Sequence, residues 1–357
     1  MRRSTRTLCL LTTALVLVLL AGCRPDPPPP QTQAAGEEAE AHPDAPAEPI
    51  SERTVLTLCY HSMAEESGST YEIAAGDFEE QLQVLADEGY ESVLPAQIAD
   101  YLEGRGDLPE KAVCITFDDG PESILTVSKP LMDRHGFVGA AFVIADSVGG
   151  GGNLTWEQVR ELEASGWEIG SHSARHERPT RLDGEALREE IAGSRETIAA
   201  QIEGDCDALA YPFGLYDEAV IDQTRSAGYR IAFTIDRGPA DQTTDPMLVP
   251  RQMLVDGNSL RTFRGWLAQE KLHLDAIDPP IGRRVSTGAT ISARLADEDV
   301  PIGGMEMSVN GRPISYEGDA ETGGLTIHPE LNTGANNLRI NYHGSPRREV
   351  SWVIVAE

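Results

Sequence analysis

The chain has 357 residues, enough for two domains or for one large domain with a smaller one. It carries 58 acidic residues against 29 lysines and arginines, a formal net charge of −29. Because binding to a phosphate backbone needs a basic surface, this charge argues against nucleic acid as a partner. The five cysteines have no short spacing, so they predict neither a disulfide framework nor a zinc cluster.

The first 23 residues have the pattern of an export signal. Three arginines precede an apolar run from Leu8 to Leu20, and this run ends in Leu20-Ala21-Gly22-Cys23. The run is shorter than the roughly 20 residues that a membrane-spanning helix needs. The ending resembles a bacterial lipoprotein box, which implies cleavage before Cys23 and lipidation of its sulfur. We therefore expect an exported cell-envelope protein that is lipid-anchored at a bacterial membrane.

Residues 24–50 are rich in proline, alanine and glutamate, and we expect them to form a disordered tether. Apolar strand-like runs and amphipathic helical runs then alternate to about residue 274, which favours an α/β domain. The first strand is Thr54 to Tyr60, and His61 stands at its end. The expected helices are Phe78 to Glu88, Pro95 to Leu102, Leu125 to His135, Trp156 to Ala164 and a long helix after Asp183 with Leu187, Ile191, Ile198 and Ile202 on its buried face.

Two adjacent carboxylates, Asp118 and Asp119, follow the apolar strand from Val113 to Phe117. Neighbouring strand residues point to opposite faces, so both acids can reach one site only where the strand stops. The turn Gly120-Pro121 is that stop. Since two adjacent acids repel each other, the pair favours a bound cation that neutralises one of them.

His172 and His176 follow another strand-like run, Trp167 to Gly170. A spacing of four places two imidazoles on one side of a helical turn. One carboxylate with two imidazoles makes a three-ligand metal site with an open position, which suits hydrolysis and leaves the other carboxylate free as a base. Alone, an Asp-Asp-Gly is usually a solvated turn and an HxxxH a helix-surface pair. The two motifs together, each at a strand end, favour the metal site.

These motifs resemble those of the polysaccharide deacetylase family, also called the NodB-homology or carbohydrate esterase family. Thr116 to Gly120 matches its first motif and Ser171 to His176 its second, and the likeness covers roughly residues 51–272. The resemblance implies a distorted (β/α) barrel, with Asp118 as catalytic base and a divalent metal held by Asp119, His172 and His176. Zinc suits one oxygen and two nitrogens, and cobalt, nickel or iron would fit as well.

The run from Ala208 to Asp217 resembles the third motif of the family, with one departure. The family has an arginine two residues before the proline, where this chain has Ala210. Phe213 matches the family's aromatic residue, whose backbone N–H is implied to stabilise the oxyanion. Arg251 is a candidate replacement for the missing guanidinium, which in the family orients the base. The alternative is that Arg251 is a surface ion-pair partner at a strand end.

The general acid of the family is usually a histidine near the end of the domain. Here the histidine in that region is His273, which we expect at the tail of a helix that starts near Ser259 and not after a strand. Tyr60-His61 and Tyr211-Pro212-Phe213-Gly214 resemble the branch that de-N-acetylates exopolysaccharides of N-acetylglucosamine. On that resemblance His61 takes the role of the acid.

From residue 275 the pattern changes to short alternating runs, and Asn310-Gly311 indicates a hairpin. We expect an all-β, immunoglobulin-like sandwich that binds polysaccharide or an envelope or export partner, or that acts as a spacer. The expected strands are Thr290 to Leu295, Met305 to Val309, Leu325 to His328, Asn337 to Tyr342 and Val350 to Val355. The expected division is therefore a signal at 1–23, a tether at 24–50, a deacetylase domain at 51–274 and a sandwich at 275–357.

The sequence favours a metal-dependent hydrolase that removes N-acetyl groups from N-acetylglucosamine units of a cell-envelope polymer or exopolysaccharide. The expected partners are this acetylated amino-sugar polymer and, through Cys23 alone, a membrane. Two alternatives remain open: an O-deacetylase of an acetylated glycan, which would have the same ligands, and a lipid-anchored polysaccharide-binding scaffold without activity.

Overall fold

The computed structural model describes residues 53–357. The predicted export signal, the lipidation site Cys23 and the tether at 24–50 lie outside the described residues. No helix in the described part of the chain combines the length and the apolar character needed to cross a bilayer.

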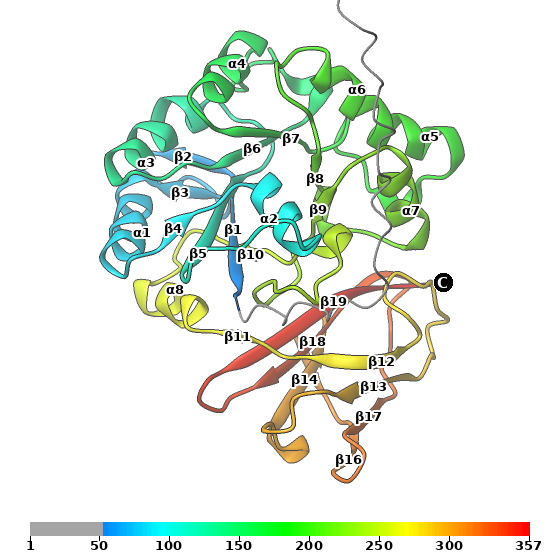
Figure 1. Ribbon diagram of the computed structural model, residues 1–357. Coiled ribbons are helices and arrows are strands. Elements are labelled where there is room, and N and C mark those ends of the chain that lie inside the picture. The colour runs from blue at the N-terminus through cyan, green and yellow to red at the C-terminus, as the bar shows by residue number, and fades with distance from the viewer. Residues whose placement is uncertain (1–52) are drawn as a thin grey trace, which may run out of the picture. The chain divides into compact units, whose positions relative to one another are not determined.

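A parallel sheet of eight strands forms the centre of the first domain (Figure 1). Its strands follow the order β10-β1-β5-β6-β7-β8-β9, and β4 lies beside β5. β1 and β5 are buried at every position, as expected for parallel strands that are covered on both faces. The strands are β1 (Val55–Tyr60), β4 (Glu91–Ser92), β5 (Ala112–Phe117), β6 (Ala140–Val143), β7 (Glu168–Ser171), β8 (Ala208–Ala210), β9 (Ile231–Phe233) and β10 (Gln252–Met253).

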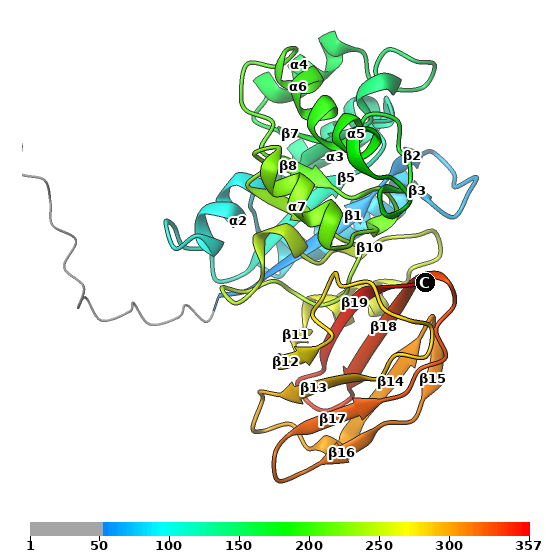
Figure 2. The ribbon, with the colours of Figure 1, turned by 90° about the vertical axis from the view of Figure 1, so that its right-hand side faces the viewer.

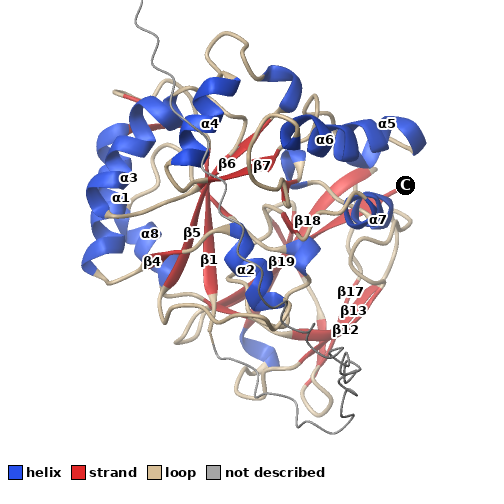
Figure 3. Cartoon of the chain, turned by 45° about the horizontal axis from the view of Figure 1, so that its top comes forward, coloured by secondary structure: helices blue, strands red, loops and turns tan. Residues whose placement is uncertain are grey.

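Helices cover the outside of this sheet (Figure 3). A π-helical turn at Glu189–Gly193 joins α5 to α6, so that together they form the predicted long helix after Asp183. Two short strands, β2 (Ser62–Ala64) and β3 (Glu72–Ala74), pair with each other after β1. The helices are α1 (Ala75–Asp87), α2 (Pro95–Leu102), α3 (Lys129–His135), α4 (Trp156–Ala164), α5 (Gly184–Arg188), α6 (Ser194–Ala199), α7 (Glu218–Ser226) and α8 (Leu260–Leu267).

Residues 249–253 bridge the two edges of the sheet. Val249 pairs with Phe233 of β9 in a single parallel bridge, and Gln252 pairs with Leu58 of β1. Only Gln252 and Met253 of this segment form a strand, β10, because the prolines at 246 and 250 lack the N–H that a strand donates. The predicted α/β sheet with helices around it is confirmed, and its edges are joined by this short irregular segment.

Two β-sheets form the C-terminal part of the chain (Figure 2). One has the order β11-β19-β18-β14-β15 and the other β12-β13-β17-β16. Asn310 and Gly311 turn β14 into β15 with φ angles of 50° and 73°, as their hairpin signal predicts. The strands are β11 (Glu270–Lys271), β12 (Leu274–Asp278), β13 (Ile291–Leu295), β14 (Met305–Val309), β15 (Arg312–Ile314), β16 (Glu317–Asp319), β17 (Gly324–Ile327), β18 (Gly334–Tyr342) and β19 (Arg348–Ala356).

β19 belongs to two hydrophobic cores at once. Trp352 and Ile354 pack in the core between the two C-terminal sheets, whereas Val353 and Val355 pack in the core of the parallel-sheet domain. Strand residues alternate between faces, so this strand is buried on both. The all-β character of this part is confirmed. Its immunoglobulin-like identity and the domain division at residue 274 stay predictions.

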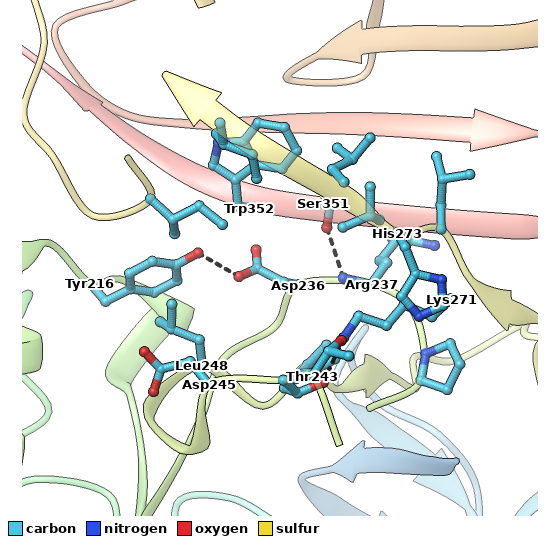
Figure 4. Close-up of a pocket in the computed structure, with 18 residues that line it drawn as sticks. Tyr216, Asp236, Arg237, Thr243, Asp245, Leu248, Lys271, His273, Ser351 and Trp352 are labelled. Carbon is cyan, nitrogen blue, oxygen red and sulfur yellow. Dashed lines mark hydrogen bonds between the residues drawn. The ribbon is translucent and has the colours of Figure 1, made fainter. Parts of the chain in front are cut away.

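Polar contacts accompany this packing (Figure 4). The hydroxyl of Tyr216 donates to Asp236 over 2.7 Å and accepts from the backbone N–H of Val353 over 3.1 Å. The backbone N–H of Arg237 donates to Ser351 Oγ over 2.7 Å. The end of β9 is therefore held against β19.

His273 belongs to the same junction and not to a helix. The helix predicted to start near Ser259 is α8, and it ends at Leu267. Beyond it, Glu270 and Lys271 form β11 and pair with β19, so His273 is not at the tail of a helix. The imidazole of His273 lies between two carboxylates, with Nε2 at 2.6 Å from Asp241 and Nδ1 at 2.9 Å from Asp297. It joins a loop of the first domain to the C-terminal sheets.

The pH dependence of the unfolding free energy tests how much His273 stabilises the folded protein. Its hydrogen bonds to Asp241 and then Asp297 raise the pKa of His273 to about 9. A raised pKa means that the stabilisation is fully present below about pH 6.5 and is lost as the pH rises through 9. Allowing for solvent screening of a partly exposed ring, we expect a loss of about 1 kcal/mol in unfolding free energy between pH 7 and about pH 10. Urea unfolding of His273→Gln should lack this loss, and an equal loss in both proteins would contradict the assignment.

Candidate active site

The predicted site residues lie at the carboxyl ends of the parallel strands. His61 follows β1, Asp118 and Asp119 follow β5, and His172 follows β7. Because the carboxyl ends of parallel strands meet at one edge of the sheet, these side chains gather although they are far apart in the sequence.

The turn after β5 allows both carboxylates to reach one place. The N–H of Asp118 donates to the carbonyl of Tyr60, so Asp118 still belongs to the strand ladder. Asp119 has a φ of 68° and Gly120 a φ of 71°, both left-handed, which reverses the chain at once. A Cβ at Gly120 would lie 3.1 Å from Val143, so a larger residue would be both strained and crowded.

The segment from His172 to His176 is a loop, and the predicted helical turn is wrong. Ser173 has a φ of 66° and His176 a φ of 61°, neither of which is helical. The hydroxyl of Ser173 accepts from the N–H of His176, and the hydroxyl of Ser171 accepts from the N–H of Ser173. These bonds between side chain and backbone replace helical ones. The two imidazoles still come together, with ring centroids 4.8 Å apart.

Asp119, His172 and His176 fit a divalent metal ion. Their possible ligand atoms all lie within 4.8 Å of one another, and Asp119 Oδ1 is 3.5 Å from Nε2 of His172 and 3.8 Å from Nε2 of His176. Asp119 Oδ1 is buried and has no hydrogen-bond partner among the described residues. His172 Nδ1 lies 2.8 Å from the carbonyl of Ala210, which leaves Nε2 free to bind a metal. Burial lowers the pKa of His172 and favours the neutral ring that metals bind.

Asp118 forms a bidentate ion pair with Arg251. Nη1 of Arg251 donates to Oδ1 over 2.7 Å and Nη2 donates to Oδ2 over 2.8 Å, while Nε donates to the carbonyl of Thr234. Arg251 is completely buried. Burial alone would raise the pKa of Asp118, but the charge of Arg251 outweighs it and holds the pKa below its usual value. Arg251, the residue before β10, thus places a guanidinium on Asp118, although the third motif has Ala210.

His61 lies beside Asp118, since their possible ligand atoms are within 4.8 Å of each other, and Phe213 lies beside His176. Phe213 has a φ of 58°, and its ring is 41% exposed and 4.4 Å from the ring of His176. The guanidinium of Arg178 lies 4.3 Å from the Phe213 ring. His61 packs on Tyr71 with ring centroids 5.2 Å apart, and Tyr71 is 51% exposed.

Cys59, Tyr71 and Arg178 are site residues that the sequence reasoning missed. Cys59 lies two residues before His61 on the same face of the strand, and this spacing was the available signal. Its sulfur is 3.4 Å from Asp118 Oδ2, and burial raises the pKa of the thiol so that it stays a donor. No local pattern in the sequence indicates Tyr71 or Arg178, which the fold brings to the site from loops.

Comparisons with known proteins agree with this geometry. Residues 105–232 match the family described as polysaccharide deacetylase. YxkH of Bacillus subtilis, assigned to the polysaccharide deacetylases, is 27% identical over 214 residues, which are 60% of this chain and 76% of that protein. The poly-β-1,6-N-acetyl-D-glucosamine N-deacetylase of Escherichia coli is 24% identical over 62% of this chain, which spans 40% of that enzyme. The solved structure of IcaB from Ammonifex degensii has a TM-score of 0.54 and 29% identity, and covers 60% of this chain and 97% of its own.

A double-mutant cycle tests the buried ion pair. Arg251→Gln leaves the carboxylate of Asp118 buried without its counter-charge, and we expect it to lower the free energy of unfolding by about 3 kcal/mol. The double variant Arg251→Gln with Asp118→Asn should lose about 2 kcal/mol less unfolding free energy than the sum of the two single losses. Urea denaturation of the four proteins at pH 7 measures this coupling. Simple additivity of the two single losses would show that the pair is not a unit.

Proposed function

We propose that this chain, whose residues 105–232 match the polysaccharide deacetylase family, hydrolyses N-acetyl groups of N-acetylglucosamine units in a cell-envelope polysaccharide or exopolysaccharide. The observation that carries this proposal is the convergence of Asp119, His172 and His176 beside the ion pair of Asp118 with Arg251. The named activity of the E. coli relative supports N-acetylglucosamine as the substrate unit.

Asp119, His172 and His176 would hold a divalent metal ion, and zinc suits their one oxygen and two nitrogens. Such an ion supplies a Lewis acid that polarises an amide carbonyl and favours ionisation of a water molecule. Ala210 assists through its carbonyl, which fixes the ring of His172.

Asp118 would accept the proton of the attacking water. Arg251 keeps the carboxylate ionised and fixes its orientation, so the base is ready without reorganisation. The backbone N–H of Phe213 would stabilise the oxygen that gains negative charge. His61 would donate a proton to the leaving amine, and its position against Tyr71 limits the rotation of its ring.

Acetate release from N-acetylglucosamine oligomers tests this function. We expect release by the purified protein, its loss with a chelator and its recovery with added zinc. Asp118→Asn and His61→Gln should each retain bound metal but lower the rate by roughly 10²- to 10⁴-fold, the usual effect of losing a general base or acid. Release at the native rate by Asp118→Asn would refute the assignment of the base. Activity on O-acetylated glycans alone would favour an O-deacetylase, and binding without turnover would favour a scaffold.

We also propose that the protein is exported and anchored through a lipid on Cys23. The support for this is the sequence of residues 1–23. Cells that express the full chain should incorporate labelled palmitate into it, and the variant Cys23→Ser should remain unlabelled. Equal labelling of both proteins would place the lipid elsewhere.

A further inference from the structure

A cleft beside the candidate active site is built from both halves of the chain. It has a volume of about 390 Å³, within the range of small-ligand sites. Phe213 lines the cleft, and its ring also packs on His176. The cleft is therefore adjacent to the proposed metal ligands. Ile235 and Met253, from the carboxyl ends of β9 and β10, line it further along, and Asn310 of the turn between β14 and β15 lines it from the C-terminal part.

The cleft is positive, although the protein as a whole is strongly negative. Arg178 and Arg237 line it, and in the described part of the chain no aspartate or glutamate does so. Neither arginine forms an ion pair with a described residue. The chain has 58 acidic residues against 29 basic ones, so a cleft lining with two arginines and no carboxylate differs in charge from the protein as a whole. Such a site attracts an anion that the remaining surface repels.

Of the two arginines, Arg237 is held more firmly in place to bind an anion. Its backbone N–H is bonded to Ser351, and a Cβ at the next residue, Gly238, would lie 2.7 Å from the carbonyl of Glu349, so the base of the side chain is fixed against β19. Glu349 is occupied by Arg339, Arg347 and Gln269. The charge of Glu349 also acts on Arg237, but Glu349 is shared with Arg339 and Arg347, whose own charges oppose that of Arg237. An anionic ligand would therefore stabilise this partly buried guanidinium.

We propose that this cleft binds a sugar unit with an anionic substituent, a carboxylate or a phosphate, next to the N-acetylglucosamine unit that is deacetylated. The proposal rests on the proposed function and narrows its substrate to an acidic glycan. A guanidinium offers paired donors to both kinds of anion, and Asn310 and Asn337 add polar groups from the C-terminal part. The C-terminal sheets then serve as one wall of a substrate site.

Matched oligosaccharides test this proposal with the full chain. The first has N-acetylglucosamine linked to glucuronic acid, the second carries the methyl ester of that acid, and the third replaces the acid by a hexose 6-phosphate unit. We expect kcat/KM to be about tenfold higher for an anionic oligomer than for the ester, as when one charge-assisted hydrogen bond is gained. Preference for the carboxylate or for the phosphate identifies which anion is bound.

Charge-removing variants connect this preference to the cleft. Arg237→Gln should reduce the ratio of kcat/KM between the anionic oligomer and the ester about tenfold, and Arg178→Gln, which is more exposed, should reduce it less. Arg261→Gln removes the same charge from the exposed surface of α8, away from the cleft, and should keep the ratio of the wild type. A ratio near one in the wild type, or an unchanged ratio in Arg237→Gln, would overturn the proposal.

Binding separates this inference from the proposed function. If no oligomer releases acetate, the proposed function fails, but the cleft is still judged by calorimetry of the same oligomers with Asp118→Asn. The anionic oligomer should bind about tenfold more tightly than its ester, and this difference should disappear when Arg237→Gln is added. Equal affinities for the acid and the ester would reject the anion site whether or not the protein is a deacetylase.

Discussion

The ion pair between Asp118 and Arg251 is the interaction on which the rest of the candidate site depends. Both side chains are almost fully excluded from water, so each charge is tolerated only because the other is present. Arg251 reaches Asp118 because residues 249–253 bridge β9 and β1. The same short segment therefore joins the edges of the sheet and keeps the carboxylate ionised. Asp119, His172 and His176 could gather at the strand ends without it, but a permanently charged carboxylate could not be buried beside them.

Exposed aromatic side chains lie on the surface near this pair. Tyr71 and Phe213 are the two exposed large hydrophobic side chains of the described residues, and they lie beside His61 and beside His176. Exposed aromatic rings offer apolar faces to sugar rings. The cleft with Arg237 continues from Phe213 along the ends of β9 and β10.

Much of the candidate site could be predicted from the sequence, because strand ends and turns leave local signals. Asp118 and Asp119 follow a buried strand and precede a glycine turn, and His172 and His176 follow another strand. The conformation between the two histidines was missed, since it depends on hydroxyl bonds of Ser171 and Ser173 that compete with a helix. Contact between Arg251 and Asp118 spans 133 residues and has no local pattern, so the sequence offered Arg251 only as a candidate. The strands after residue 275 were found from their alternation, but nothing in that alternation indicates that Asn310 faces the ends of β9 and β10.

Both faces of β19 are buried, each in a different hydrophobic core, and this limits how the two halves of the chain can be separated or exchanged. Its odd- and even-numbered residues fill different cores, so the strand is at once the last element of the sandwich and a cover for the catalytic half. An excised fragment without β19 would present bare apolar surface, and the hydroxyl of Tyr216 would lose the hydrogen bond that it accepts from Val353. Grafting a different C-terminal module onto the catalytic half would succeed only if the newcomer supplied an equivalent strand in the same register.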